Sequence, residues 1–143
     1  MRVIGFNFTK IFAERPKSFK RGSISTNVEF IDFDKEKVEF LKETDVAKLS
    51  FKYSVVYDSS EDKKADKKAE ISLEGIILLD VTKDELKELQ KNWKKKNLSA
   101  RIKIPLFNLI LKKCSPKTMQ LQDELNLPTH LPIPQIKPQA EPK

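Results

Sequence analysis

Cysteine, histidine and glycine are scarce in this chain of 143 residues, which contains one Cys, one His and three Gly. The single Cys114 cannot form an intramolecular disulfide, and a lone thiol fits a reducing compartment. The chain also offers hardly any base that would activate this thiol as a nucleophile. His130 has no Cys and no second His near it in the sequence, so a metal ion would find only one such ligand there. We therefore expect neither a catalytic thiol nor a metal site.

Phosphate-binding loops and membrane-spanning segments are missing as well. The sequence contains neither GxGxxG nor GxxxxGK(S/T), the glycine-rich loops that cradle nucleotide phosphates. No apolar run approaches the roughly 18 residues that a membrane helix needs. The N-terminal sequence MRVIGFNFTKIFAER lacks the uninterrupted apolar core of a signal peptide. We expect a cytoplasmic protein that does not insert into membranes, is not an enzyme and needs no cofactor.

Positive charge, in contrast, is abundant and unevenly distributed. The formal net charge is +7, and residues 83–103 hold eight Lys or Arg against three Asp or Glu. Such a surface attracts acidic partners, whether nucleic acid, anionic lipid or an acidic protein. The candidate contacts for an anionic partner are Lys91, Lys94, Lys95, Lys96 and Arg101.

The stretch KNWKKKNLSARIK, residues 91–103, combines this charge with Trp93, a composition that suits nucleic-acid binding. However, no zinc module, helix-turn-helix or aromatic recognition motif accompanies it. Lysines outnumber arginines, which fits a solvated face better than bidentate reading of bases. A basic module that binds RNA or the ribosome therefore stays an alternative.

The first 81 residues have the two-residue alternation of β-strands. Near the N-terminus the apolar positions change phase between Phe8 and Ile11, which predicts a bulge near Thr9–Lys10. Residues 22–34 change phase in the same way between Phe30 and Ile31. We expect two long, bent strands, joined by a long connection over residues 12–21 rather than by a tight hairpin.

The clearest alternation covers residues 49–57 and resumes over 71–81, after the charged stretch DSSEDKKADKKAE at 58–70. Two such runs on either side of a charged loop predict a hairpin with one buried face. Together with the two bent strands, they predict an antiparallel sheet of four strands, with five as the alternative. Because helical patterns follow, the fold class is α+β, with two helices packed on one face of the sheet.

The helical part begins with Thr82-Lys83-Asp84-Glu85, a capping box. Leu86, Leu89 and Trp93 then form one narrow apolar stripe, and Asn97 is the expected end of this first helix. A second helix is expected to begin near Pro105, since proline suits a first helical turn. Pro116 should break or kink it, with Ser115 as the cap of a continuation.

The second helix is apolar around most of its circumference, whereas a helix that lies on one sheet needs only one apolar stripe. Another subunit is the simplest cover for the remaining side. The candidate subunit-interface residues are Phe107, Leu109, Ile110 and Leu111.

The segment LQDELNLPTHLPIPQIK, 121–137, carries apolar residues into a run of prolines, where a disordered tail would be polar. We expect it to pack back on its own domain beside an apolar groove. A single domain would then cover residues 1–136, followed by a flexible tail at 137–143.

In its order of elements the chain resembles the SecB family of export chaperones. The resemblance rests on FKYSVVYD (51–58), AEISLEGIILL (69–79), IPLFNLILKKC (104–114) and LNLPTHLPIPQI (125–136). It implies a four-stranded antiparallel sheet backed by helices, assembly into dimers or tetramers, and binding of long unfolded polypeptides in apolar grooves. Bacterial members are acidic, dock the SecA motor through acidic surface and carry a final helix, whereas this chain has a net charge of +7 and ends soon after the prolines.

The sequence and the resemblance together predict a chaperone that holds unfolded chains or preproteins without ATP, with a role in protein export. It would act as a homodimer or homotetramer. The alternatives are the basic RNA-binding module and a chaperone dedicated to a single partner such as an antitoxin. Candidate residues for the client groove are Phe12, Phe19, Trp93, Leu127, Leu131, Ile133 and Ile136.

Overall fold

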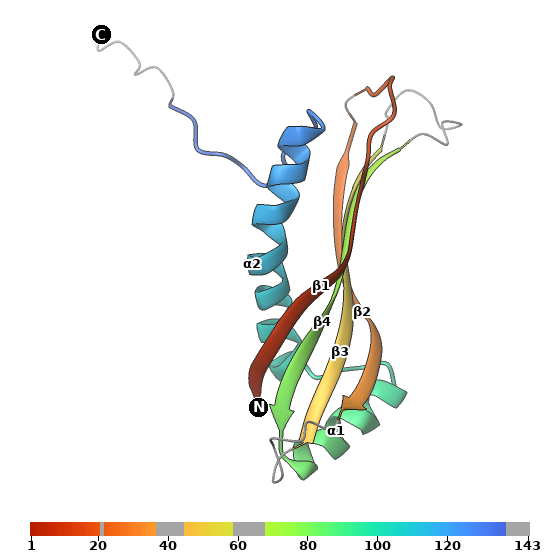
Figure 1. Cartoon of the computed structure of the whole chain (residues 1–143), viewed down its shortest axis with the longest axis vertical. Helices are drawn as coiled ribbons and strands as arrows, with labels where there is room; N and C mark the ends of the chain where they lie inside the picture. Colours follow the sequence, from red (N-terminus) through yellow and green to blue (C-terminus); the bar gives the residue numbers. More distant parts are fainter. Residues whose placement is uncertain (21, 37–44, 59–67, 137–143) are drawn as a thin grey trace.

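The computed structural model describes residues 1–20, 22–36, 45–58 and 68–136. Its elements are four strands and two helices (Figure 1), in the order β1 (Arg2–Glu14), β2 (Ile24–Glu36), β3 (Asp45–Tyr57), β4 (Ala69–Val81), α1 (Lys83–Lys94) and α2 (Ala100–Glu124). The strands form one antiparallel sheet in the order β1-β4-β3-β2, and no fifth strand occurs in these ranges. The predicted α+β fold is confirmed.

The two edge strands, β1 and β2, follow each other in sequence but do not pair with each other. β1 pairs with β4 and β2 pairs with β3, while β3 and β4 form the predicted hairpin at the centre. The chain must therefore cross the width of the sheet between Glu14 and Ile24, which explains why this connection is long. Of the predicted charged loop at 58–70, residues 59–67 lie outside the described residues, as does the predicted tail at 137–143, and Ala69 and Glu70 belong to β4.

Both predicted bulges are present. The register shifts between Phe8 and Lys10 in β1, and between Phe30 and Asp32 in β2. A further shift between Val3 and Gly5 adds to the irregularity of β1. Each bulge increases local twist and bends the strand, and the whole sheet is visibly bent and twisted in Figure 1.

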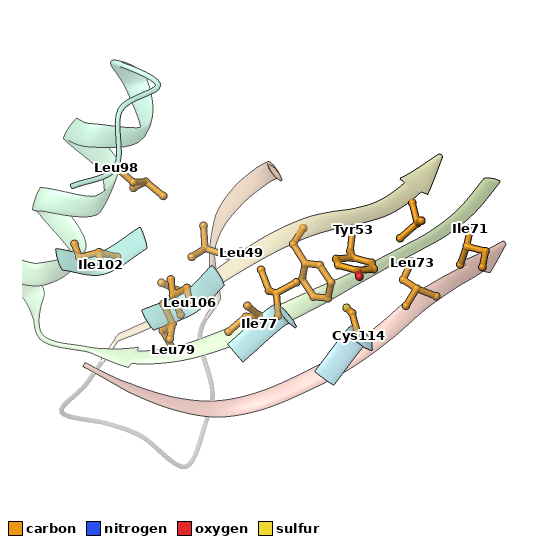
Figure 2. Close-up of a cluster of buried hydrophobic side chains, with 14 of the residues drawn as sticks. Leu49, Tyr53, Ile71, Leu73, Ile77, Leu79, Leu98, Ile102, Leu106 and Cys114 are labelled. Carbon is orange, nitrogen blue, oxygen red and sulfur yellow. The ribbon is translucent and has the colours of Figure 1, made fainter. Parts of the chain in front are cut away.

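The core lies between α2 and one face of the sheet (Figure 2). The side chains of β3 and β4 on this face are fully buried, with alternation that matches the sequence pattern from Leu49 to Tyr57. The stripe that α2 buries recurs every fourth residue: Ile102, Leu106, Ile110, Cys114, Thr118 and Gln122. Residues four apart share one face of a helix, so α2 rests on the sheet along its whole length.

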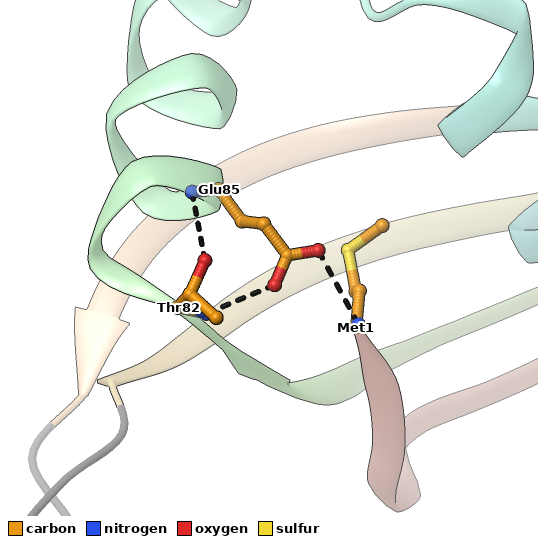
Figure 3. Close-up of polar contacts among 3 residues, drawn as sticks. All are labelled: Met1, Thr82 and Glu85. Atoms are coloured by element: carbon orange, nitrogen blue, oxygen red, sulfur yellow. Dashed lines mark hydrogen bonds and ion pairs between the residues drawn. The ribbon is translucent and has the colours of Figure 1, made fainter.

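Helix α1 begins at the predicted capping box (Figure 3). The Glu85 amide donates to Thr82 Oγ1 at 3.2 Å, and the Thr82 amide donates to Glu85 Oε1 at 3.0 Å. The second carboxylate oxygen of Glu85 lies 3.3 Å from the Met1 amino group, which ties the start of β1 to this cap. The helix ends at Lys94, before the predicted Asn97, because Lys96 adopts a left-handed backbone with φ of 53°.

Helix α2 corrects three predictions. It begins at Ala100 rather than near Pro105, it runs through Pro116 without a break to Glu124, and Ser115 caps nothing because it lies inside the helix. An internal proline removes one backbone hydrogen bond and costs about 3 kcal/mol. The buried stripe continues on both sides of Pro116, with Cys114 before it and Thr118 after it. Burial along this stripe outweighs the lost bond, since helices in proteins are stabilised mainly by packing.

Candidate functional site

A groove of about 560 Å³ opens between edge strand β2, the C-terminal end of α1 and the first half of α2. We call it the β2 groove. Its lining residues are Val28, Glu29, Phe30, Ile31, Trp93, Lys96, Leu98, Lys103 and Phe107. Six of the nine are apolar, and the volume falls within the range of about 300–1,000 Å³ that is usual for ligand sites.

The groove exists because α2 covers the central strands more completely than the edge. Core-face residues of β3 such as Phe51 and Tyr53 are fully buried, whereas their partners on β2, Phe30 and Val28, remain partly exposed. The Phe30 ring stacks on Phe107 of α2 with centroids 5.0 Å apart. This ring pair joins strand to helix and forms one wall of the groove.

Trp93 forms a second aromatic wall. It lies in the last turn of α1, in the same stripe as the buried Leu86 and Leu89, and its ring is 6.1 Å from that of Phe33. The indole is only partly buried and lines the groove. Of the residues predicted for a client groove, Trp93 is the one that the structure places in this site.

Two lysines border these aromatic walls. Lys96 follows Trp93 by three residues, and Lys103 precedes Phe107 by one helical turn, with its Nζ atom 5.3 Å from the Phe107 ring centroid. Residues 91–103 carry six positive side chains and no acidic one. Within the described ranges, none of these six forms an ion pair.

The predicted anionic contacts are thus divided between the groove and its surroundings. Lys96 lines the groove. The other four, Lys91, Lys94, Lys95 and Arg101, are exposed on α1, just after it or on the first turn of α2, and do not line the groove.

The remaining aromatic candidates lie elsewhere. Phe12 is on β1 at the opposite edge of the sheet, paired with Ser72, where its ring is 5.9 Å from Lys10 Nζ. Phe19 lies in the connection after β1 and packs against Tyr57, with ring centroids 5.8 Å apart. Neither residue lines the β2 groove.

The C-terminal segment follows the prediction only in part. Leu127 is 6% exposed and belongs to the core, so its prediction as a groove residue is wrong. Beyond His130 the chain leads away from the sheet (Figure 1), and Leu131, Ile133 and Ile136 are exposed and do not line the groove. The prediction that these three residues pack back on the domain is therefore wrong. Two prolines within 131–136 remove backbone donors that would otherwise fix the segment to a strand.

A buried polar network fixes the start of this segment. Gln122 Nε2 donates to the Tyr57 hydroxyl at 2.6 Å, and that hydroxyl donates to the Pro128 carbonyl oxygen at 2.5 Å. His130 Nε2 lies 2.6 Å from the Tyr53 hydroxyl, and its Nδ1 lies 3.0 Å from Gln122 Nε2. Burial raises the pKa of both tyrosines and lowers the pKa of His130. The network is therefore held in its neutral form.

The prediction that Ile110 lies at a subunit interface is wrong, because its side chain is fully buried between α2 and the sheet. Phe107 is partly covered by Phe30 and lines the groove, and Leu109 is also partly buried. Leu111 is exposed. Ile104, which was not among the candidates, is the most exposed large apolar residue of α2.

The largest set of exposed apolar side chains lies on β1 and was not predicted. It consists of Val3, Ile4, Phe8, Ile11 and Phe12, which alternate between the two faces of the strand, and we call this strand with its exposed side chains the β1 edge. β1 pairs with β4 on one side, and no other described strand pairs with its second side. The alternation of the sequence identified β1 as a strand but could not show that α2 would leave it uncovered.

Comparison with protein-family models, curated proteins and solved structures gave no match to this chain. None of the helices in the described ranges has the length and apolarity to span a bilayer. In the same ranges, no group of three or more His, Cys, Asp or Glu side chains is placed to hold a metal ion.

Proposed function

We propose that this chain is a SecB-like holdase in the cytoplasm, which binds segments of unfolded polypeptides in the β2 groove without ATP. The observation that carries the proposal is the groove itself, with the partly exposed rings of Phe30, Trp93 and Phe107 around an open apolar space. Covering a few hundred Å² of apolar surface at ~25 cal/mol per Å² provides several kcal/mol before ordering costs. A free energy of this size suits reversible binding of one segment. Several such segments on the same client would add to the affinity because they are linked in one chain.

An extended client segment fits this location because the groove borders an edge strand. β2 pairs with β3 on one side, and its other side pairs with no described strand. A peptide alongside β2 would find backbone partners there and would place alternate side chains in the groove. The bulge between Phe30 and Asp32 limits such pairing to short stretches, which favours weak and sequence-tolerant binding.

The proposed assembly is a homodimer formed through the β1 edge. A long edge strand with exposed apolar residues tends to associate with another chain. Two antiparallel copies of β1 would pair their open backbone N–H and C=O groups about a two-fold axis, the commonest symmetry of protein dimers. Delivery of preproteins to an export motor would be a further role of such an assembly.

The test is light scattering of a chemically unfolded protein that aggregates on dilution, with and without an equimolar amount of this chain. We expect suppression of scattering without ATP and at high salt. Unchanged scattering at several-fold excess of the chain would contradict the proposal.

A second candidate function is RNA binding, which is favoured by the six cations of residues 91–103 beside Trp93, none of which forms an ion pair with a described residue. The distinguishing measurement is salt dependence, since affinity based on phosphates falls steeply with salt and apolar capture does not.

A further inference from the structure

We propose that the β2 groove selects client segments in which an aromatic or large aliphatic residue is flanked by Asp or Glu. This inference rests on the proposed function and adds the class of substrate. It follows from the placement of cations around the groove and from the absence of acidic partners for them in the described part of the chain.

Each aromatic wall has a lysine beside it. Lys96 comes three residues after Trp93, and the Nζ atom of Lys103 lies 5.3 Å from the Phe107 ring centroid. In an extended peptide, side chains on one face repeat every ~6.6 Å. A client ring placed between the aromatic walls would therefore bring a carboxylate one or two residues away within reach of either lysine. Such charge-assisted contacts are stronger than neutral hydrogen bonds.

The acidic residues of β2, the strand that borders the groove, do not neutralise these lysines. Glu29 is the one acidic residue that lines the groove, and no ion pair links it to Lys96 or Lys103. Two further acids of β2, Asp32 and Asp34, pair in register with Ser50 and Lys48. Because Phe33 and its partner Leu49 belong to the core side of these strands, alternation directs Asp32 and Asp34 to the other face of the sheet. Of the charged residues that line the groove, two are basic and one is acidic, so the lining carries a formal net charge of +1.

A peptide fits these features better than a single-stranded nucleic acid. Stacking of bases requires free aromatic faces, whereas Phe30 and Phe107 stack on each other with an interplanar angle of 27°. The aliphatic residues Val28, Ile31 and Leu98 make much of the remaining lining. A client peptide that carries both apolar side chains and carboxylates would match the apolar lining and the two lysines of the groove.

The test uses three fluorescent peptides with one apolar core and different flanks, namely Asp/Glu, Ser/Gln or Lys/Arg, with binding measured by fluorescence anisotropy. At low salt we expect the acidic peptide to bind about tenfold more tightly than the basic one, with the neutral peptide between them. The difference should shrink at high salt because exposed charges are screened.

Charge reversal then locates the effect. The double variant Lys96→Glu/Lys103→Glu should reverse the order of the three peptides. The matched control Lys87→Glu/Lys112→Glu changes the net charge equally at exposed lysines that do not line the groove, and should retain the order.

The outcomes separate the two proposals. Equal binding of all three peptides would overturn the selectivity and leave the holdase intact. Binding of none of them would overturn both. Binding of polyuridine in preference to every peptide, abolished by Lys96→Glu/Lys103→Glu, would overturn the inference in favour of a nucleic-acid site.

Discussion

Gly75 lies on β4 with the backbone of β1 and the ring of Phe51 close around it. A Cβ atom at this position would lie 2.5 Å from the carbonyl oxygen of Asn7 and 2.6 Å from the Phe51 ring. Real Cβ atoms do not approach other atoms so closely, so any side chain must displace either the edge strand or a core aromatic. Glycine here is required by space rather than by backbone conformation.

We expect Gly75→Ala to lower the free energy of unfolding by about 1–3 kcal/mol, measured by urea denaturation, because overpacking forces the core apart. The matched control is Gly5→Ala, whose added Cβ would lie 3.1 Å from the end of the movable Leu78 side chain. This control should cost much less. Equal losses for the two variants would contradict the argument.

His130 predicts a pH dependence of stability. Burial lowers its pKa below the ordinary value of 6.5, so the folded protein binds this proton less readily than the unfolded chain. The resulting stabilisation is complete above pH 6.5 and is lost as the pH falls below that value. Urea denaturation between pH 5.5 and 8 should show this decrease for the native chain. Since His130 is the sole histidine, His130→Gln should remove the decrease, and an unchanged pH profile would contradict the assignment.

At the scale of elements, the C-terminal segment divides at His130. Up to that residue it is fixed by Leu127 in the core and by the bonds of Pro128 and His130. Beyond it, residues 131–136 are exposed and form no hydrogen bond with the described part of the chain. An exposed apolar segment of this kind contributes little to the stability of the fold.

A chain that ends after His130 should therefore unfold at the same urea concentration as the full chain. A chain that ends after Asn126 should lose about 2 kcal/mol or more, because it removes a buried leucine and leaves the Tyr57 hydroxyl without its acceptor. Equal stability of the two truncated chains would show that the segment is not anchored as described.

The elements differ in how well the sequence predicted them. The β3–β4 hairpin and the start of α1 were predictable, because alternation and the capping box are local patterns. The course of α2 through Pro105 and Pro116 was not, since burial of a stripe along this helix of 25 residues outweighs the local preference of proline. The groove could not be predicted either, because its lining comes from β2, α1, α2 and the α1–α2 connection, which only the fold brings together. Trp93 was accessible to prediction as the final, partly covered residue of an apolar stripe.

At the scale of the whole molecule, two surfaces stand on opposite edges of the sheet. The β2 groove is at one edge and the β1 edge is at the other. A dimer formed through β1 would therefore leave both grooves open, at the two ends of a continuous sheet. One long client could then occupy both grooves, which raises its apparent affinity without new contacts.

Light scattering coupled to size-exclusion chromatography tests this assembly. We expect twice the chain mass for the native protein and the monomer mass for Ile11→Lys, which places a charge on the β1 edge. Ile104→Lys introduces the same charge on the exposed side of α2 and should leave the dimer intact. Dissociation by Ile104→Lys alone would instead place the subunit contact on the helix.

The central claim is that clients occupy the β2 groove, and the fluorescence of Trp93 tests it most directly, because this residue is the only tryptophan and lines the groove. The measurement is a titration with an unfolded polypeptide that contains no tryptophan. Occupation of the groove excludes water from the indole, so the account predicts a saturable shift of its emission to shorter wavelength. That shift should follow the same binding curve as the suppression of aggregation. Suppression of aggregation with no change in Trp93 emission would contradict the claim and place client binding elsewhere on the molecule.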